Sequence, residues 1–334
     1  MAFEKSVMVT GVGGFIGGPL VAHLAKNGWK VITVTTRDEN DLAAAARLDL
    51  DGGIKYIKIP DINHYESYES AAKDVDVVVH LAGVAHQVSR RVGDDVYEAV
   101  NVRGAVKVAQ AALRAGVKRF VYASSIKVHG DFTKNSPFTE QSPFDPRDAY
   151  AASKVKAERA LCELLPGSGM ELTIFRPTLV YGPGVKGNMA NLLKLASKSP
   201  VVPYIQSANK RSFLYAGNLN EAVETLMTHP AAAGESFILS DGGGVSTREL
   251  ILAISRGMGK NAILLPVPGI FLAAGAKFGD LWESLTGSVF PLNSKSVTKL
   301  TGSLLVDSSK ITSLTGWRPR FSMEEGIREM VKRA

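Results

Sequence analysis

The chain has 334 residues, of which 45% are hydrophobic, and a formal net charge of +7. This length and apolar content suffice for a large core in one big domain or two interlocked domains. A single cysteine, Cys162, excludes a disulfide framework and a cysteine-rich metal site. Scattered lysines and arginines argue against nucleic acid and favour small anionic ligands. No run resembles a secretory signal or a membrane span, so we expect a cytoplasmic protein.

The first informative stretch predicts a strand, a tight loop and the start of a helix. Val7–Val9 is a short apolar run that suits a buried strand, and an apolar helical period follows it. The loop between them places Gly11, Gly14 and Gly17 three residues apart. Glycines there permit a sharp turn and let a pyrophosphate approach a helix N-terminus. A glycine-rich turn without a ligand is the alternative, but the position at the start of a βαβ pattern favours dinucleotide binding.

The end of the second strand bears on the choice of cofactor. Val31–Thr35 alternates like a strand and leads into Thr36 and Arg37, with no acid before Asp38. A unit that binds NAD usually carries an acid here to hold the ribose 2′-hydroxyl, whereas an arginine accommodates a 2′-phosphate. We therefore predict that NADP(H) is favoured over NAD(H). The alternative is that Arg37 is an ordinary exposed side chain on a solvated loop.

Strands and helices continue to alternate through the first half of the chain. Apolar runs and helical periodicity predict strands over Ile54–Ile59, Val75–Leu81, Arg119–Ser124 and Leu172–Arg176, and a helix over Val96–Ala115. Such alternation specifies a parallel, doubly wound sheet. Small residues after the fourth strand, Ala82 and Gly83, leave room for a cofactor across its carboxyl end.

The chain beyond Pro177 mixes short helices, Pro-Gly turns and isolated strands. Helices are predicted over Asn188–Ser199, Gly217–His229, Thr247–Met258 and Ile270–Phe278. The last of these is apolar and is followed by Trp282 and Leu285. We expect it in the core or in the wall of a substrate domain rather than as a membrane-seeking segment. The histidines do not pair at ligand spacing, so no metal site is expected.

The residue types for proton transfer lie near the fifth strand. Ser125 ends that strand, and Tyr150 and Lys154, four residues apart, share one face of a helix. A phenol has a pKa of about 10, but a neighbouring ammonium lowers it by favouring the phenolate. A serine hydroxyl can then hold a carbonyl oxygen while the phenol transfers a proton. Alone, a tyrosine and a lysine at this spacing usually mark only a surface helix.

The ordered set of glycine loop, Asn101, Ser125, Tyr150 and Lys154 resembles the extended short-chain dehydrogenase/reductase family. That family includes NAD-dependent epimerases, dehydratases and reductases of nucleotide sugars. The resemblance covers nearly the whole chain and includes Arg176–Gly184, Arg211–Leu219 and Val306–Pro319. It implies that Ser125, Tyr150 and Lys154 are catalytic, that Asn101 supports the active site, and that Arg211 faces phosphate.

The resemblance also implies a fold and a set of contacts. The fold is a Rossmann doubly wound parallel α/β sheet with a smaller mixed α/β C-terminal substrate domain. The cofactor domain covers 1–176 and about 211–234, and the sugar-binding domain covers about 177–210 and 235–334. Cofactor contacts are expected from Gly11, Gly14, Phe15, Ile16, Gly17, Thr36, Arg37, Asp61, Ile62, Leu81, Ala82, Gly83, Asn101, Tyr150, Lys154 and Pro177. Substrate contacts are expected from Ser125, Lys127, Tyr150, Asn188 and Arg211. We expect a homodimer.

The sequence around Ser125-Ile126-Lys127 and over 302–307 looks most like one branch of the family. That branch reduces UDP-4-keto-6-deoxy-N-acetylhexosamines for surface polysaccharides such as the lipopolysaccharide O-antigen. The first hypothesis is therefore an NADP(H)-dependent 4-reductase of such a UDP-sugar. The alternative is a 4-epimerase of UDP-glucose or UDP-N-acetylglucosamine that retains NAD. A 4,6-dehydratase is disfavoured because no Asp-Glu pair follows Ser125, and a dinucleotide sensor would not need all three catalytic residues. His129, where many relatives carry tyrosine, is expected to serve packing.

Overall fold

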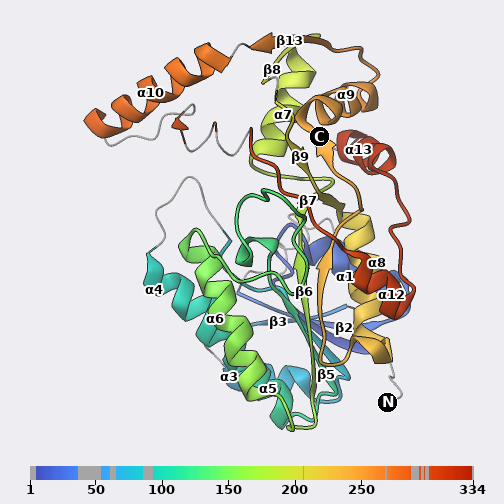
Figure 1. Ribbon diagram of the computed structural model, residues 1–334. Helices are drawn as coiled ribbons and strands as arrows, with labels where there is room; N and C mark the ends of the chain where they lie inside the picture. Colours follow the sequence, from blue (N-terminus) through green and yellow to red (C-terminus); the bar gives the residue numbers. More distant parts are fainter. Residues whose placement is uncertain are drawn as a thin grey trace.

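The computed structural model describes residues 5–36, 54–60, 65–85, 93–205, 207–267, 269–286, 293–294, 297 and 301–332. Seven parallel strands form one central sheet in the order β11-β6-β5-β4-β1-β2-β3 (Figure 1). Their bounds are β1 Ser6–Thr10, β2 Lys30–Thr35, β3 Ile54–Lys58, β4 Val77–His80, β5 Arg119–Ala123, β6 Glu171–Pro177 and β11 Ser236–Leu239. This confirms the predicted doubly wound parallel sheet. The predicted cofactor contacts Arg37, Asp61 and Ile62 lie outside the described residues.

Helices cover both faces of this sheet. One apolar layer joins the sheet to α1 (Gly17–Lys26), α8 (Ala216–Thr228) and α12 (Ser309–Thr315). The other joins it to α3 (Tyr65–Ala72), α5 (Gly104–Arg114) and α6 (Ala149–Leu164). Successive strand side chains point to opposite faces, so Val7 and Val9 belong to the first layer and Met8 to the second. All three are fully buried, which explains the continuous apolar runs in the sequence.

The helix predicted over Val96–Ala115 is not uniform. It begins as α4 (Asp94–Tyr97), widens into the π-helix η1 (Glu98–Arg103) and continues as α5. π-Helical turns are rare and occur mostly at functional sites. Here the wide turn carries Asn101, whose side chain is buried. Two short 3₁₀ turns, η2 (Ile126–Val128) and η3 (Pro230–Ala232), follow later in the chain.

A smaller mixed α/β part lies beyond the carboxyl edge of the sheet (Figure 1). It contains α7 (Asn188–Lys198), α9 (Thr247–Gly257), α13 (Met323–Lys332) and three two-stranded sheets. The strand pairs are β7 (Leu179–Tyr181) with β10 (Phe213–Tyr215), β9 (Lys210–Arg211) with β12 (Val245–Ser246), and β8 (Val201–Ile205) with β13 (Ile263–Val267). Its core includes Tyr181, Leu193, Ile254 and Ile327. β11 and α12, although late in the chain, pack with the central sheet, and the proposed domain boundaries stay a prediction.

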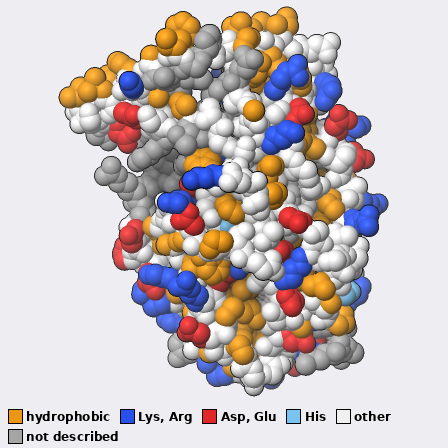
Figure 2. All heavy atoms as spheres, in the orientation of Figure 1, with side chains coloured by type: hydrophobic (Ala, Val, Ile, Leu, Met, Phe, Trp, Pro, Cys, Tyr) orange, Lys and Arg blue, Asp and Glu red, His pale blue; other side chains and the backbone are white. Residues whose placement is uncertain are grey.

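The apolar helix α10 (Gly269–Thr286) differs from expectation. Its large side chains do not lie in the core: Ile270, Phe271 and Leu285 are 74%, 67% and 77% exposed. The helix extends away from the main body at the far end of the smaller part (Figure 1), and apolar side chains line that edge of the surface (Figure 2). A core position is therefore wrong, because composition shows that a helix is apolar but not what lies against it. A place in the wall of a substrate domain stays a prediction. Within the described ranges, no helix meets the length and hydropathy needed to cross a membrane.

Candidate active site

The glycine loop joins β1 to α1 at the carboxyl edge of the sheet. Gly11 has φ +79°, and a Cβ there would lie 2.6 Å from the Ala82 nitrogen of the chain that follows β4. A Cβ on Gly17 would lie 2.3 Å from the Gly11 carbonyl oxygen. Only glycine fits either position, so the backbone can approach a ligand closely. No described side chain caps the start of α1, whose N–H groups are suited to an anion.

A cleft of about 520 Å³ opens beside this loop. The loop glycines, the ends of β2 and β4 and the residues after them line it: Gly11, Gly13, Gly14, Val34, Thr35, Thr36, Ile59, Pro60, Tyr68, Leu81, Ala82, Gly83, Val84 and Val100. The predicted contacts Thr36, Leu81, Ala82 and Gly83 thus share one cavity with the glycines. Its position at the carboxyl ends of parallel strands is where open α/β sheets bind their ligands. The position of this cleft and the chemistry of its glycine loop suit a dinucleotide.

Asn101 connects the cleft to helix α6. Its Oδ1 accepts a hydrogen bond from the Val84 N–H (2.8 Å), and its Nδ2 donates to the Val84 carbonyl (3.1 Å) and to Ser153 Oγ (2.9 Å). The side chain is 1% exposed and has both ends satisfied. It therefore fixes the chain after β4 against α6, and its supporting role in the active site stays a prediction.

Ser125 and Tyr150 face each other across the site. Ser125 follows β5 in extended conformation, and its Oγ accepts a hydrogen bond from the Lys127 N–H at the start of η2. Tyr150 lies in the first turn of α6, where Asp148 caps the helix by accepting from the Ala151 N–H (2.8 Å). Burial raises the pKa of Tyr150 to about 12, and its hydrogen bond with Ser125 acts in the opposite direction. At neutral pH the phenol is protonated and can act as an acid.

Lys154 is buried one turn further along α6. Its ammonium donates to the Ala123 carbonyl (2.7 Å) and to the Tyr122 hydroxyl (3.3 Å). Burial lowers the pKa of Lys154 to about 8, and the Glu158 carboxylate partly restores it. The expectation that Lys154 lowers the pKa of Tyr150 is not met, because burial of the phenol dominates and the ammonium is directed at Ala123. A Cβ on Gly83 would lie 3.6 Å from Lys154 Nζ, so this lysine borders the cofactor cleft.

The predicted substrate contacts Lys127 and Arg211 approach the same acid. Lys127 forms ion pairs with Asp148 and, at 3.6 Å, with Asp131. Arg211 on β9 donates to the Gly302 carbonyl (3.1 Å) and lies near enough to Asp131 for that carboxylate to raise its pKa against the stronger lowering by burial. The two cations are thus brought toward each other from the central sheet and the smaller part. Cations so placed suit a diphosphate.

The remaining predicted contacts lie at element ends. Phe15 and Ile16 are partly buried in the turn before α1, and Pro177 ends β6. Asn188 is the first residue of α7 and is exposed. These positions are compatible with the predicted contacts but do not test them.

A buried ion pair holds the floor of the site. Arg176 donates to both oxygens of Glu158, with Nε–Oε1 at 3.0 Å and Nη2–Oε2 at 2.5 Å. Its Nη1 lies 3.1 Å from His129 Nε2, and the His129 ring stacks on Phe144 at 5.6 Å. Burial, followed by the charge of Arg176, lowers the pKa of His129. His129 therefore packs beneath the site as a neutral ring, as the sequence predicts.

Two serines were not singled out from the sequence. Ser153 links Asn101 to α6 and donates to the Tyr150 carbonyl (2.7 Å). Ser124 Oγ is buried and has no hydrogen-bond partner among the described residues. Each is the sequence neighbour of a predicted catalytic residue, Lys154 or Ser125. A polar residue next to a predicted catalytic residue is the sequence signal that could have identified these two serines as part of the site.

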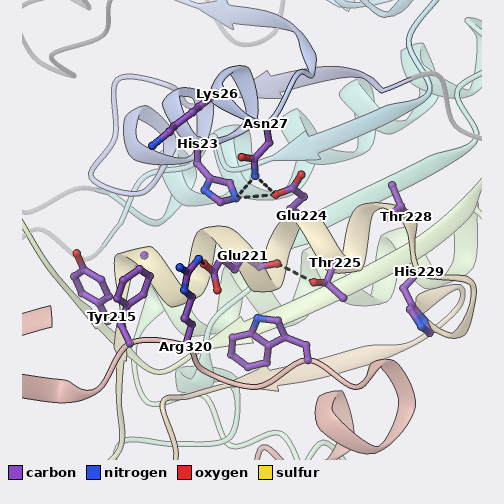
Figure 3. A pocket seen from close by; sticks show the side chains of 13 residues that line it. His23, Lys26, Asn27, Tyr215, Glu221, Glu224, Thr225, Thr228, His229 and Arg320 are labelled. Carbon is purple, nitrogen blue, oxygen red and sulfur yellow. Dashed lines mark hydrogen bonds and ion pairs between the residues drawn. The ribbon is translucent and has the colours of Figure 1, made fainter. Parts of the chain in front are cut away.

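A larger cavity, about 690 Å³, lies elsewhere, along α1 and α8 (Figure 3). In it Glu224 accepts hydrogen bonds from His23, Asn27 and Trp29 at 2.6–2.8 Å. Although burial alone would raise it, these hydrogen bonds leave the pKa of Glu224 lowered. The cluster ties α1 to α8, and none of the predicted catalytic residues lines the cavity. Across the described residues, no group of three His, Cys, Asp or Glu side chains could hold a metal ion.

Comparison with known proteins agrees with this geometry. The model of the NAD dependent epimerase/dehydratase family matches residues 7–239. A Vibrio cholerae protein named UDP-glucose 4-epimerase is 36% identical, with 97% of this chain and 94% of the relative covered. An Escherichia coli O157:H7 protein named N-acetyl-alpha-D-glucosaminyl-diphospho-ditrans,octacis-undecaprenol 4-epimerase is 28% identical, with 81% of each chain covered. The solved structure of a Thermus thermophilus UDP-glucose 4-epimerase with NAD superposes with a TM-score of 0.74 at 22% identity and covers 98% of both chains. The chain belongs to the NAD dependent epimerase/dehydratase family of enzymes.

Proposed function

We propose that this protein exchanges a hydride and a proton at C4 of a UDP-linked hexose and is a UDP-hexose 4-epimerase. The observation that carries the proposal is the meeting of Ser125, Tyr150 and Lys154 beside the dinucleotide cleft, in a chain that matches a protein named UDP-glucose 4-epimerase along almost its full length. We prefer the epimerase to the 4-reductase because a relative that covers 97% of this chain is named UDP-glucose 4-epimerase.

Each residue has a role that follows from its position. Tyr150 transfers the proton of the C4 hydroxyl, Ser125 holds the C4 oxygen, and Lys154, which borders the cofactor cleft, holds a ribose hydroxyl. A bound nicotinamide supplies the hydride acceptor. Arg211 and Lys127 lie where they can bind the diphosphate of the nucleotide. The glycine loop and the start of α1 bind the pyrophosphate of the cofactor.

A second candidate is the NADPH-dependent 4-reductase of a UDP-4-keto-6-deoxy-N-acetylhexosamine. One observation favours it: the carboxyl end of β2, at the cofactor cleft, carries Thr35 and Thr36 and no acid. A chain without that acid lacks a usual ribose clamp for NAD. The end of β2 therefore supports NADP(H) as a cofactor that exchanges with solution. A reductase needs such exchange in every cycle, whereas an epimerase does not.

One set of assays separates the two candidates. The purified protein is incubated with UDP-glucose or UDP-N-acetylglucosamine without added cofactor, and the C4 epimers are resolved by chromatography. In parallel, NADPH absorbance is followed with the 4-keto sugar. Epimer formation without NADPH loss supports the proposal. One NADPH consumed per keto-sugar, with no epimerisation, would replace it with the reductase. Calorimetry of Arg37→Ala with NADPH and NADH then tests the predicted cofactor preference, which the substitution should erase if Arg37 binds the 2′-phosphate.

A further inference from the structure

The exposed side of α10 is an uninterrupted apolar arc. At about 100° per residue, its large apolar side chains fall within about 120° of the helix circumference. They are Ile270, Phe271, Phe278, Leu281, Trp282 and Leu285, each between 45% and 77% exposed. Phe278 and Trp282 lie side by side, with ring centroids 6.3 Å apart. Contiguous exposed apolar surface of this kind marks an interaction site.

The acids of α10 are turned out of this arc. Asp280 accepts hydrogen bonds from the Ser294 N–H (3.0 Å) and hydroxyl (2.5 Å), and Glu283 accepts one from Asn293 (3.3 Å). Ala276 and Gly279, on the same side as Glu283, are buried. Lys277 is exposed and lies at the border of the arc, next to the position of Ile270. The exposed side therefore combines large apolar residues, two aromatic types and a cation.

The segments near α10 add further exposed apolar side chains and further positive charge. Ile263 and Leu265 on β13, which directly precedes α10, are 64% and 56% exposed, and Val201 on β8 is 40% exposed. These strands lie at the same end of the molecule as α10 (Figure 1), where apolar side chains gather along the outer edge (Figure 2). On α7, which packs against β8, Lys194 and Lys198 are exposed. A positive charge beside an apolar surface is complementary to anionic lipid headgroups.

We propose that the exposed face of α10 docks on an anionic lipid membrane surface, with the helix lying in the plane of the interface. This geometry requires no spanning segment. A helix with a cationic border, a face containing Phe, Leu and Trp, and its acids on the other side is the arrangement of an interfacial helix. Such docking would locate the enzyme at a membrane surface, whether it is an epimerase or a reductase.

A second copy of the chain fits this face less well. An 18-residue helix is about 27 Å long and about 10 Å wide, so its exposed face offers on the order of 300 Å². A standard protein interface buries about 800 Å² on each partner. In a two-fold dimer each subunit would also present the same lysine-bordered patch to its partner. A lipid surface, in contrast, can accept a single projecting helix and is favoured by its charge.

Vesicle binding of the full-length protein tests the proposal. The protein is sedimented with vesicles of phosphatidylglycerol and phosphatidylcholine in equal amounts, and with vesicles of phosphatidylcholine alone. We expect binding to the anionic vesicles, weakened by added salt, and at least a tenfold weaker partition for the double variant Phe271→Gln/Leu285→Gln. Leu314→Gln is the matched control, because Leu314 is 41% exposed on α12, away from α10. Its partition should equal that of the unmodified protein.

Fluorescence gives a second readout. Trp282 is 45% exposed, whereas Trp29 and Trp317 are 4% and 8% exposed, so Trp282 should account for a blue shift on addition of anionic vesicles. Trp282→Phe should remove the shift and keep most of the binding. Unchanged melting temperatures show that the variants are folded. No binding of the unmodified protein, or equal binding by the double variant, overturns the proposal. So does an oligomer that the double variant dissociates while no form binds vesicles, which would make this face an interface between copies.

Discussion

Replacing Glu158 by glutamine isolates the contribution of the buried ion pair beneath the active site. The Glu158 and Arg176 side chains are only 3% and 5% exposed, and the guanidinium contacts both carboxylate oxygens. The substitution keeps the size of the side chain but removes its charge, which leaves the buried Arg176 uncompensated. The His129 ring and the Glu140 backbone carbonyl remain near the guanidinium, but neither carries a negative charge that could replace the carboxylate.

The cost follows from this geometry. Removing one partner of a buried ion pair typically destabilises a protein by about 3–5 kcal/mol. An unfolding entropy of about 2.1 cal/mol/K per residue gives about 0.7 kcal/mol/K for the whole chain. Glu158→Gln should therefore lower the melting temperature by about 4–7 °C if the chain unfolds as one unit. Because Glu158 also raises the pKa of Lys154, the same substitution should move that pKa further below about 8.

The assay is a thermal melt at pH 7, followed by circular dichroism. Glu163→Gln is the matched control, since Glu163 lies on the same helix α6 but is exposed. Surface substitutions usually change stability by less than about 0.5 kcal/mol, so the control should shift the melting temperature by less than about 1 °C. If Glu158→Gln melts within about 1 °C of this control, the ion pair does not stabilise the fold as argued.

Three further predictions concern the site itself. Tyr150→Phe should lower kcat by about 10²–10⁴-fold and leave cofactor affinity nearly unchanged, whereas Tyr97→Phe, whose ring lies 6.4 Å away, should keep its activity; equal turnover for both would refute the role of Tyr150. Gly17→Ala should weaken NAD and NADPH binding in calorimetry, because its Cβ would lie 2.3 Å from the Gly11 oxygen; affinity like that of the unmodified protein would contradict the loop assignment. Lys154→Met should melt higher than the unmodified protein at pH 7, with the gain shrinking from pH 8 toward pH 10.5. The folded lysine has a pKa of about 8 against 10.5 unfolded, so the unfolded chain binds more protons in this window and the unmodified protein gains stability as pH rises. A gain in melting temperature that is independent of pH would refute the lowered pKa of Lys154.

The sequence predicts the central sheet because its strands are buried on both faces. Alternate residues of β1, Val7 and Met8, enter different apolar layers, so the whole strand must be apolar and stands out in the sequence. The glycine loop is predicted for a related reason. Gly11 and Gly17 are required by contacts between backbone atoms, which leave a pattern of glycines at fixed spacing.

Features that depend on contacts between distant segments escape the sequence. Asp148 lies 21 residues from Lys127, and nothing in that spacing shows that its carboxylate reaches the ammonium. The π-helical turn at Asn101 is another example, since its residues have an ordinary helical pattern. The pKa of Tyr150 is a third, because it depends on how deeply the phenol is buried, which the spacing of Tyr150 and Lys154 does not show.

Burial of Lys154 connects the stability of the fold to its chemistry. A buried ammonium destabilises the protein, and the same burial lowers the pKa of Lys154 to about 8. Glu158 reduces the cost, but it does so while also compensating Arg176, whose guanidinium contacts both of its oxygens. One carboxylate therefore serves two buried cations, Arg176 and the proposed catalytic residue Lys154. Because the pKa of Lys154 is about 8, charge that arrives in the cleft can change the protonation of this lysine near neutral pH.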